Sequence, residues 1–301
     1  LKLGNSNDFG YDYIKDFEKR FTLKQRSTTS TGWLPIDMIT GGGLGRGELG
    51  VVIAPTGAGK SMALVHLATH ALRAGKTVVY YTLELEDTAV ASRFDSCLTG
   101  IPLNNLLEFK EVIMEKVKGT NGSLIIKEYP TKQASTETIK NHLNRLKNRG
   151  IEPDLIAIDY ADLLKPVRFQ REKRQELEET YEELRGLAKM TKCCLWTASQ
   201  TNRSGLNAEV ITMESISEAF NKCFVADFIF SLSRTMEDKQ TNSGRFYIAK
   251  NRNGPDGIVF DIFMDTSCVN IKIIDDQAQD PNVVMKNAVK KQEELLKEKY
   301  K

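Results

Sequence analysis

The sequence predicts an α/β fold with a mostly parallel central sheet. Short apolar runs, rich in β-branched and aromatic residues, recur along the 301-residue chain, and helical patterns separate the first four of them. The runs are apolar throughout rather than alternating, which is typical of strands that are covered on both faces. Because strands that alternate with helices are joined by right-handed crossovers, we expect these strands to pair in parallel.

The individual strands and helices follow from these patterns in chain order. Helical patterns at 61–75 and 137–150 close on Gly75 and Gly150, and glycine is common just past the end of a helix. The expected strands are ELGVVIA (48–54), KTVVYYTL (76–83), SLIIKEY (123–129), DLIAIDY (154–160), KCCLWTAS (192–199) and VADFIFSLS (225–233).

The last part of the chain predicts a different kind of pairing. Three further strand patterns follow one another by short turns, RFYIAKNR (245–252), GIVFDIFMD (257–265) and SCVNIKIID (267–275). Strands joined by short turns pair antiparallel. We therefore expect the sheet to finish in C-terminal antiparallel hairpins.

Composition along the chain predicts one large domain between two appendages. Apolar residues at helical spacing over 10–21 predict a short helix, and a run of small polar residues follows it. We expect a linker helix and linker over 1–30, the α/β domain over 31–276, and a helical or disordered Lys-rich tail over 277–301. The first residue is Leu rather than Met, so we expect a fragment of a longer protein.

Charge and cysteine usage exclude several classes of protein. The chain has 42 Lys and Arg against 40 Asp and Glu, so affinity for nucleic acid must come from local clusters rather than from a basic bulk. Its five cysteines show no C-x-x-C spacing, which argues against a disulfide framework or a zinc site. No apolar stretch is long enough for a membrane span, so we expect no membrane partner and a cytoplasmic location, in a bacterial cell or a phage-infected host.

A phosphate-binding loop follows the first predicted strand. Glycines in such a loop let backbone N–H groups surround a phosphate, Lys60 reaches the β- and γ-phosphates, and Ser61 ligates Mg²⁺. Ala54 stands where the strict pattern has Gly, which is tolerable if that position does not need a positive φ. The alternative is a chance glycine-rich turn. The residues predicted to bind ATP are Pro55, Thr56, Gly57, Ala58, Gly59, Lys60 and Ser61.

Two carboxylates extend this nucleotide site. Asp159 ends a buried strand, where it is expected to hold Mg²⁺ together with Ser61. Glu84 follows the next strand after the loop, and a carboxylate at that edge of the sheet faces the crevice in which α/β sheets bind ligands. There it can deprotonate the attacking water. For Asp159, the alternative is an aspartate that only caps a turn. For Glu84, the alternative is a solvated acidic turn that also contains Glu86.

An ordered set of motifs resembles a known family. The segments TGWLPIDMITGGGLGRGEL, APTGAGKS, YYTLELE, LIAIDYADLL, TASQTNRSG and IAKNRNGPDG occur in this order over roughly residues 28–275. The set resembles the RecA-like C-terminal motor domain of the DnaB-type replicative helicases. The resemblance implies a RecA-like P-loop ATPase core preceded by a linker helix. It also implies a ring-shaped homohexamer that encircles single-stranded DNA, moves 5′ to 3′ and unwinds duplex DNA using ATP.

The resemblance also assigns catalytic roles. Glu84 matches the catalytic glutamate of the family, and Gln200 matches the glutamine that couples the γ-phosphate to the DNA-binding loops. Lys250 and Arg252 match a basic pair that reaches the γ-phosphate held by the neighbouring subunit. Such a guanidinium stabilises the charge of the transition state, so an isolated subunit should hydrolyse ATP poorly. An ordinary charged strand end is the alternative.

Two segments are candidates for binding DNA. The run KPVRFQREKR directly follows the Asp159 strand, where its charge can be coupled to the phosphate state of the nucleotide. A solvated loop paired with the acidic helix that follows is the alternative. The segment after Gln200 is the second candidate. The residues proposed to contact DNA are Lys165, Arg168, Arg171, Lys173, Arg174 and Arg203.

Departures from the family leave other functions open. Asp162 stands where many relatives have Gln. We expect the sequence to lack the N-terminal collar that usually binds primase in the family, although primase remains a candidate partner. A RecA- or RadA-type recombinase and a KaiC-like nucleotide-switched scaffold are the competing hypotheses, and a small-molecule P-loop kinase is a weaker one. Displacement of an annealed strand, as opposed to pairing of homologous strands, would separate the helicase from the recombinase. Salt-sensitive stimulation of ATP hydrolysis by single-stranded DNA would separate both from the scaffold.

Overall fold

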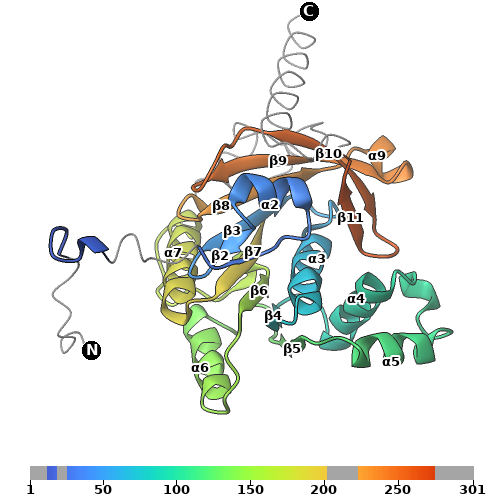
Figure 1. Ribbon diagram of the computed structural model, residues 1–301, viewed down its shortest axis with the longest axis horizontal. Coiled ribbons are helices and arrows are strands. Elements are labelled where there is room, and N and C mark those ends of the chain that lie inside the picture. Colours follow the sequence, from blue (N-terminus) through green and yellow to red (C-terminus); the bar gives the residue numbers. More distant parts are fainter. Residues whose placement is uncertain (1–11, 19–25, 202–222, 275–301) are drawn as a thin grey trace, which may run out of the picture.

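The computed structural model describes residues 12–18, 26–201 and 223–274, and a nine-stranded sheet forms its centre (Figure 1). The strand order is β11-β10-β9-β8-β3-β7-β6-β4-β5. The strands are β3 (Leu49–Ala54), β4 (Thr77–Thr82), β5 (Ser123–Glu128), β6 (Leu155–Asp159), β7 (Cys194–Gln200), β8 (Phe228–Ser233), β9 (Ser243–Asn251), β10 (Val259–Asp265) and β11 (Asn270–Ile273).

The pairing within this sheet confirms the predicted fold class. Strands β8, β3, β7, β6, β4 and β5 pair in parallel, whereas β9, β10 and β11 continue the sheet in antiparallel pairs. A separate two-stranded ribbon joins β1 (Thr28–Thr29) to β2 (Leu44–Gly45). The C-terminal hairpins are therefore present as predicted.

Helices cover both faces of the sheet, which explains why its strands are apolar throughout. Along β3, Val52 and Ala54 belong to a core shared with α2, α3 and α4, whereas Val51 and Ile53 belong to a core shared with α6 and α7. In Figure 1, α3 lies on one side of the parallel strands and α7 on the other. The helices are α2 (Leu34–Thr40), α3 (Lys60–Arg73), α4 (Asp87–Thr99), α5 (Lys110–Lys118), α6 (Thr136–Lys147), α7 (Lys173–Thr191) and α9 (Met236–Gln240).

The two helices predicted to close on glycine do so in the structure. Gly75 follows α3 with φ 75° and Gly150 follows α6 with φ 77°, a backbone conformation that disfavours other residues. At its other end α6 begins with a capping box, in which the Ser135 side chain accepts from the Thr138 N–H and Thr138 reaches back to Ser135. For α6, these local signals mark both ends of the helix that connects β5 to β6.

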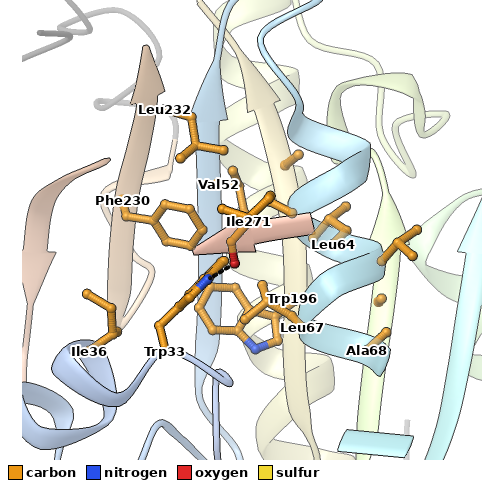
Figure 2. Packing of buried hydrophobic residues seen from close by; sticks show 14 of the residues in the cluster. Trp33, Ile36, Val52, Leu64, Leu67, Ala68, Trp196, Phe230, Leu232 and Ile271 are labelled. Carbon is orange, nitrogen blue, oxygen red and sulfur yellow. Dashed lines mark hydrogen bonds between the residues drawn. The ribbon is translucent and has the colours of Figure 1, made fainter. Parts of the chain in front are cut away.

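Trp33 anchors the core that α2 and α3 share with the sheet (Figure 2). Its side chain is 3% exposed, its ring packs edge-on against Phe230 and Phe246, and its Nε1 donates to the carbonyl oxygen of Ile271 at 2.9 Å. This contact ties the segment before α2 to β11, the last strand of the sheet.

We expect Trp33→Ala to lower the free energy of unfolding by about 3–5 kcal/mol, because it removes a large buried ring and leaves a cavity. Denaturant unfolding followed by circular dichroism measures the change. Leu34→Ala is the matched control because Leu34 is 62% exposed, and we expect a change within about 0.5 kcal/mol. Equal losses in both variants would contradict this account of the core.

Parts of the sequence predictions lie outside the described residues. The expected linker helix over 10–21 is described only for residues 12–18, where a turn leads into helical backbone at 17–18. The expected tail over 277–301 lies wholly outside the described part. Within the described part, none of the helices has the length and apolar character needed to cross a membrane.

Candidate functional site

The loop between β3 and α3 has the backbone geometry of a phosphate cradle. Gly57 and Gly59 have φ values of 73° and 102°, and a Cβ added at Gly59 would lie 1.8 Å from Met264 Cε. The positive φ at Gly59 strains any other residue type, and the end of the Met264 side chain would also have to move. Ala54 is not among the described residues with positive φ, so the position tolerates alanine, as the sequence suggested. Lys60 starts α3 and its Nζ donates to the carbonyl oxygen of Pro55 at 3.2 Å.

Ser61 and Asp159 meet beneath this loop. The Ser61 hydroxyl donates to Asp159 Oδ1 at 3.1 Å, and the Tyr80 hydroxyl donates to Oδ2 at 3.0 Å. Asp159 is 1% exposed. Burial raises the pKa of its carboxyl group, while the hydrogen bonds from Ser61 and Tyr80 lower it. Two hard oxygen ligands at this spacing fit Mg²⁺, which prefers carboxylate and hydroxyl oxygen.

A pocket opens at the carboxyl ends of the parallel strands and contains most of the predicted nucleotide residues. Its lining includes Glu84, which is exposed and lies two residues after β4. In the sheet, β7 and β6 lie between β3 and β4, so Glu84 does not come from a strand adjacent to the loop. It reaches the same pocket because parallel strands end at a common edge. The lining residues are Thr56, Gly57, Gly59, Lys60, Ser61, Met62, Glu84, Leu85, Arg93, Tyr160, Gln200 and Thr266.

Gln200 ends β7 and connects the phosphate loop to the Asp159 segment. Its Nε2 donates to Thr56 Oγ1 at 2.7 Å, and its Oε1 accepts from the Tyr160 hydroxyl at 3.2 Å. The Gln200 backbone N–H donates to Asp162 Oδ2 at 3.1 Å, and the Tyr181 hydroxyl of α7 donates to Asp162 Oδ1 at 2.9 Å. Asp162, to which the sequence assigned no role, therefore holds the end of β7 and α7 together.

Sequence reasoning missed several residues of this site. Arg93 lies on α4, lines the pocket, and contributes a positive charge that lowers the pKa of Asp159. Tyr80 and Tyr160 bind Asp159 and Gln200, as described above. Tyr80 and Tyr160 lie within quoted family segments, but no role was assigned to them, and Arg93 lies outside every quoted segment. Each side chain reaches the site through the packing of separate elements. Among the residues 12–18, 26–201 and 223–274, no group of three His, Cys, Asp or Glu side chains could hold a metal ion alone.

The basic pair at the end of β9, Lys250 and Arg252, lies at the opposite edge of the sheet from this pocket. In the strand register, Phe228 of β8 pairs with both Gly50 of β3 and Asn251 of β9. Lys250 and Arg252, on either side of Asn251, therefore lie level with the start of β3. The phosphate loop follows the other end of β3, after Ala54. Six residues of strand span about 20 Å. The structure thus brings Lys60, Ser61, Glu84, Asp159 and Gln200 together and leaves Lys250 and Arg252 apart from them.

The candidate DNA-binding residues divide into three groups. Lys165, Arg168 and Arg171 lie between Leu164 and α7. Lys173 and Arg174 belong to the first turn of α7 rather than to the preceding loop, and Arg174 pairs with Glu178. Arg203 lies outside the described residues.

Lys132 fixes the base of the basic segment. Its Nζ donates to the carbonyl oxygens of Asp162 and Leu164 at 2.8 and 3.0 Å. The Lys165 N–H donates to the Ala134 carbonyl oxygen at 2.8 Å. Beyond this base, Phe169 is 78% exposed. The basic segment 165–174 therefore begins from backbone that Lys132 and Ala134 hold in place, a few residues after Asp159.

Comparisons with known proteins agree with the motifs. The family model for the DnaB-like helicase C-terminal domain matches residues 29–269. The chain is 30% identical over 252 residues to the DnaB-like replicative helicase of Enterobacteria phage T4, which covers 79% of this chain and 53% of that protein. It is 26% identical over 198 residues to the replicative DNA helicase DnaB of Helicobacter pylori, and the match covers 64% of this chain and 40% of that protein. The chain thus spans about half the length of the curated relatives it matches.

Solved structures share the fold. An ATPase domain of known structure superposes with a TM-score of 0.72 at 17% identity, covering 87% of this chain and 97% of that one. A DnaB-like replicative helicase, studied with its primase interactions, superposes with a TM-score of 0.73 at 17% identity. The match covers 88% of this chain and 68% of that one. The predicted membership of the DnaB-type helicase family is confirmed, and the recombinase alternative is not favoured. With its P-loop pocket, its RecA-like sheet and a family match over most of its length, the chain belongs to the DnaB-like helicase C-terminal domain family.

Proposed function

We propose that the chain is the ATP-hydrolysing motor of a ring helicase that moves 5′ to 3′ on single-stranded DNA, and that the ring is a hexamer. The observation that carries the proposal is the register of the sheet. The phosphate loop and the Lys250–Arg252 pair lie at opposite edges of one chain, about 20 Å apart along β3. A pair so placed does not reach a phosphate bound by its own loop, so any nucleotide phosphate that it contacts belongs to a neighbour.

ATP binding is assigned to the loop of Pro55–Ser61. The backbone N–H groups of the loop and the start of α3 face the phosphates, and Lys60 Nζ leaves the Pro55 carbonyl oxygen to bind the β- and γ-phosphates. Mg²⁺, held by Ser61 and Asp159, would neutralise developing phosphate charge. Tyr80 keeps the Asp159 carboxylate oriented by a hydrogen bond to Oδ2.

Glu84 is assigned the role of general base. Its carboxylate lines the pocket together with Lys60 and Gln200. The carboxylate accepts a proton from water, the water oxygen attacks the γ-phosphorus, and the bond to the β–γ bridging oxygen breaks to release ADP. Lys250 and Arg252 of the adjacent subunit stabilise the negative charge that spreads over the γ-phosphate oxygens.

DNA binding is assigned to the segment 165–174 and to Arg203. The segment begins at the Asp162–Leu164 base that Gln200 and Lys132 contact. A change at the phosphate loop is therefore passed through Gln200 and Asp162 to the basic segment. Contacts to the DNA backbone rather than to bases suit a motor that ignores sequence.

We expect the double variant Arg168→Ala and Arg171→Ala to bind single-stranded DNA more weakly. The slope of log K against log salt should fall by about 1.4, since each lost phosphate contact removes about 0.7 for a single strand. Fluorescence anisotropy of a labelled oligonucleotide over a salt series measures it. Arg145→Ala with Arg149→Ala removes the same charge from exposed positions at the end of α6 and just beyond it. An equal slope change in that control would contradict the assignment.

The whole assembly is tested by mass and by direction of movement. We expect light scattering to give a six-subunit particle with ATP present, and we expect the chain to displace an annealed strand only from substrates with a 5′ single-stranded tail. Pairing of homologous strands without displacement would favour the recombinase instead. Primase is a proposed partner, and the cytoplasm of a bacterium or of a phage-infected host is the proposed location.

A further inference from the structure

A buried carboxylate stands beside Arg252. Asp227 lies directly before β8, and its side chain is 5% exposed. Its Oδ1 is 3.0 Å from Arg252 Nη1 and 3.1 Å from Arg185 Nη2. Its Oδ2 accepts from the Leu49 backbone N–H at 3.0 Å. One carboxylate therefore binds two guanidinium groups through the same oxygen.

The two arginines hold Asp227 differently. Arg185, from α7, contacts it through Nη2 at 3.1 Å and through Nε, 3.5 Å from Oδ2, and its side chain is 23% exposed. The Arg252 side chain makes the single contact at 3.0 Å and is 47% exposed. Its backbone N–H separately donates to the Asp227 carbonyl oxygen at 2.9 Å. The backbone of Arg252 is thus fixed while its guanidinium can turn outward.

Among the residues that the structure describes, positive charge exceeds negative charge around Asp227. Lys250 lies in the same group, with its Nζ donating to the Phe224 carbonyl oxygen and 4.1 Å from the centre of the Phe224 ring. Burial lowers the pKa of Lys250, and the charges of Arg252 and Arg185 lower it further while Asp227 raises it. Two guanidinium groups bind Asp227, and the Lys250 ammonium lies near enough to interact with it electrostatically, so this group of described residues favours an additional anion.

Resting on the proposed function, we propose that Asp227 and Arg185 are positioning residues for Arg252. Asp227 holds the Arg252 guanidinium at the edge of the sheet while the interface is empty. When a neighbour brings in ATP, Arg252 exchanges the Asp227 carboxylate for the γ-phosphate. Arg185 then keeps Asp227 paired. Without Arg185, the departure of Arg252 would leave a buried and unpaired carboxylate, which is strongly unfavourable.

The same carboxylate links this edge to the phosphate loop of its own chain. Leu49 begins β3, and it binds Asp227 both through the Oδ2 contact and through its carbonyl oxygen, which accepts from the Asp227 N–H at 2.8 Å. Strand β3 then runs directly into the loop at Pro55. Asp227, which binds Arg252, is therefore fixed to the start of β3, and the other end of this strand leads into the proposed nucleotide-binding loop.

The test uses Arg185→Gln, Arg185→Lys and Asp227→Asn in the full chain. We expect Arg185→Gln and Asp227→Asn to lower kcat for ssDNA-stimulated ATP hydrolysis by about 10- to 100-fold, the size expected for losing a hydrogen bond to a charged group. Nucleotide affinity and particle mass should stay unchanged, because the pocket lies at the other edge. Arg185→Lys should recover most of kcat because it keeps the charge. A purely structural role would lower nucleotide affinity and the unfolding temperature without this charge-dependent rescue.

Arg245→Gln is the matched control. It removes an arginine of similar exposure, 27% against 23%, from the ion pair between Arg245 of β9 and Asp238 of α9. We expect wild-type turnover from it. A second readout mixes Arg185→Gln with Glu84→Gln subunits, since an intact pocket of the first can then meet an intact Arg252 of the second. Activity above that of either variant alone supports the proposal.

The outcomes separate this inference from the function on which it rests. If Arg252→Ala loses turnover while Arg185→Gln and Asp227→Asn behave like Arg245→Gln, the positioning role is overturned and the proposed function stands. If Arg252→Ala itself keeps full ssDNA-stimulated turnover, the interface assignment and this inference are overturned together. Should Asp227→Asn fail to fold, the Arg185 variants and the mixing readout decide.

Discussion

An Arg252→Ala variant is expected to lose about 10³- to 10⁵-fold in ssDNA-stimulated ATP turnover, the range by which a guanidinium supplied to a transferring phosphoryl group accelerates other P-loop enzymes. Its nucleotide affinity should remain, because Arg252 lies beside the start of β3 and the pocket follows the end of that strand. Steady-state phosphate release and equilibrium binding of a fluorescent ATP analogue measure the two quantities separately.

Mixing experiments decide whether Arg252 acts on a neighbour. In an equal mixture of Arg252→Ala and Glu84→Gln subunits, about a quarter of the head-to-tail junctions combine an intact pocket with an intact Arg252. We therefore expect partial recovery of turnover from two inactive preparations. A mixture of Lys60→Ala and Glu84→Gln is the control, since both changes lie in one pocket and no junction becomes intact. Recovery in the control, or none in the test mixture, would contradict action between subunits.

A Glu84→Gln variant is expected to bind ATP and single-stranded DNA like the wild type and to turn over about 10²- to 10⁴-fold more slowly, the usual contribution of a general base. Glutamine keeps the size of the side chain but does not accept the proton of the attacking water. Single-turnover hydrolysis measures the chemical step, and the binding assays used for Arg252→Ala measure affinity.

Two comparison variants sharpen this result. Glu86→Gln changes an exposed carboxylate two residues further on, at the cap of α4, and should turn over normally. Lys60→Ala should instead abolish ATP binding, because Lys60 Nζ is the cation of the phosphate loop. Normal turnover in Glu84→Gln, or an equal defect in Glu86→Gln, would remove Glu84 from the proposed mechanism.

The strands and the phosphate loop could be predicted because their signals are local. The run at 48–54 became β3 with a shift of one residue, since strand, glycine-rich loop and helix follow one another without interruption. Gly75 and Gly150 marked helix ends correctly for the same reason, as each adopts a positive φ within its own turn. Continuous apolarity correctly indicated burial on both faces of the sheet.

The strand order and the neighbours of the catalytic groups could not be predicted in this way. Glu84 comes from a strand separated from β3 by two others, and this order depends on contacts between distant segments. Arg93 reaches the pocket from α4, and Arg185 reaches Asp227 across 42 positions of sequence. In the sequence Asp162 is only a departure from the family, whereas in the structure its two oxygens bind Gln200 and Tyr181.

Placing the pocket and Arg252 at opposite edges gives any assembly of these chains a polarity. In the proposed ring, each subunit would offer one face with a pocket and one face with Arg252. A closed ring would then complete every site, whereas an open arc would have one pocket at its end that no Arg252 meets. A ring that opens to admit a DNA strand would therefore stop hydrolysing ATP at the junction that has opened. Closure of the ring around the strand would restore ATP hydrolysis at that junction. The rate of ATP hydrolysis per ring would therefore show whether the ring is open or closed.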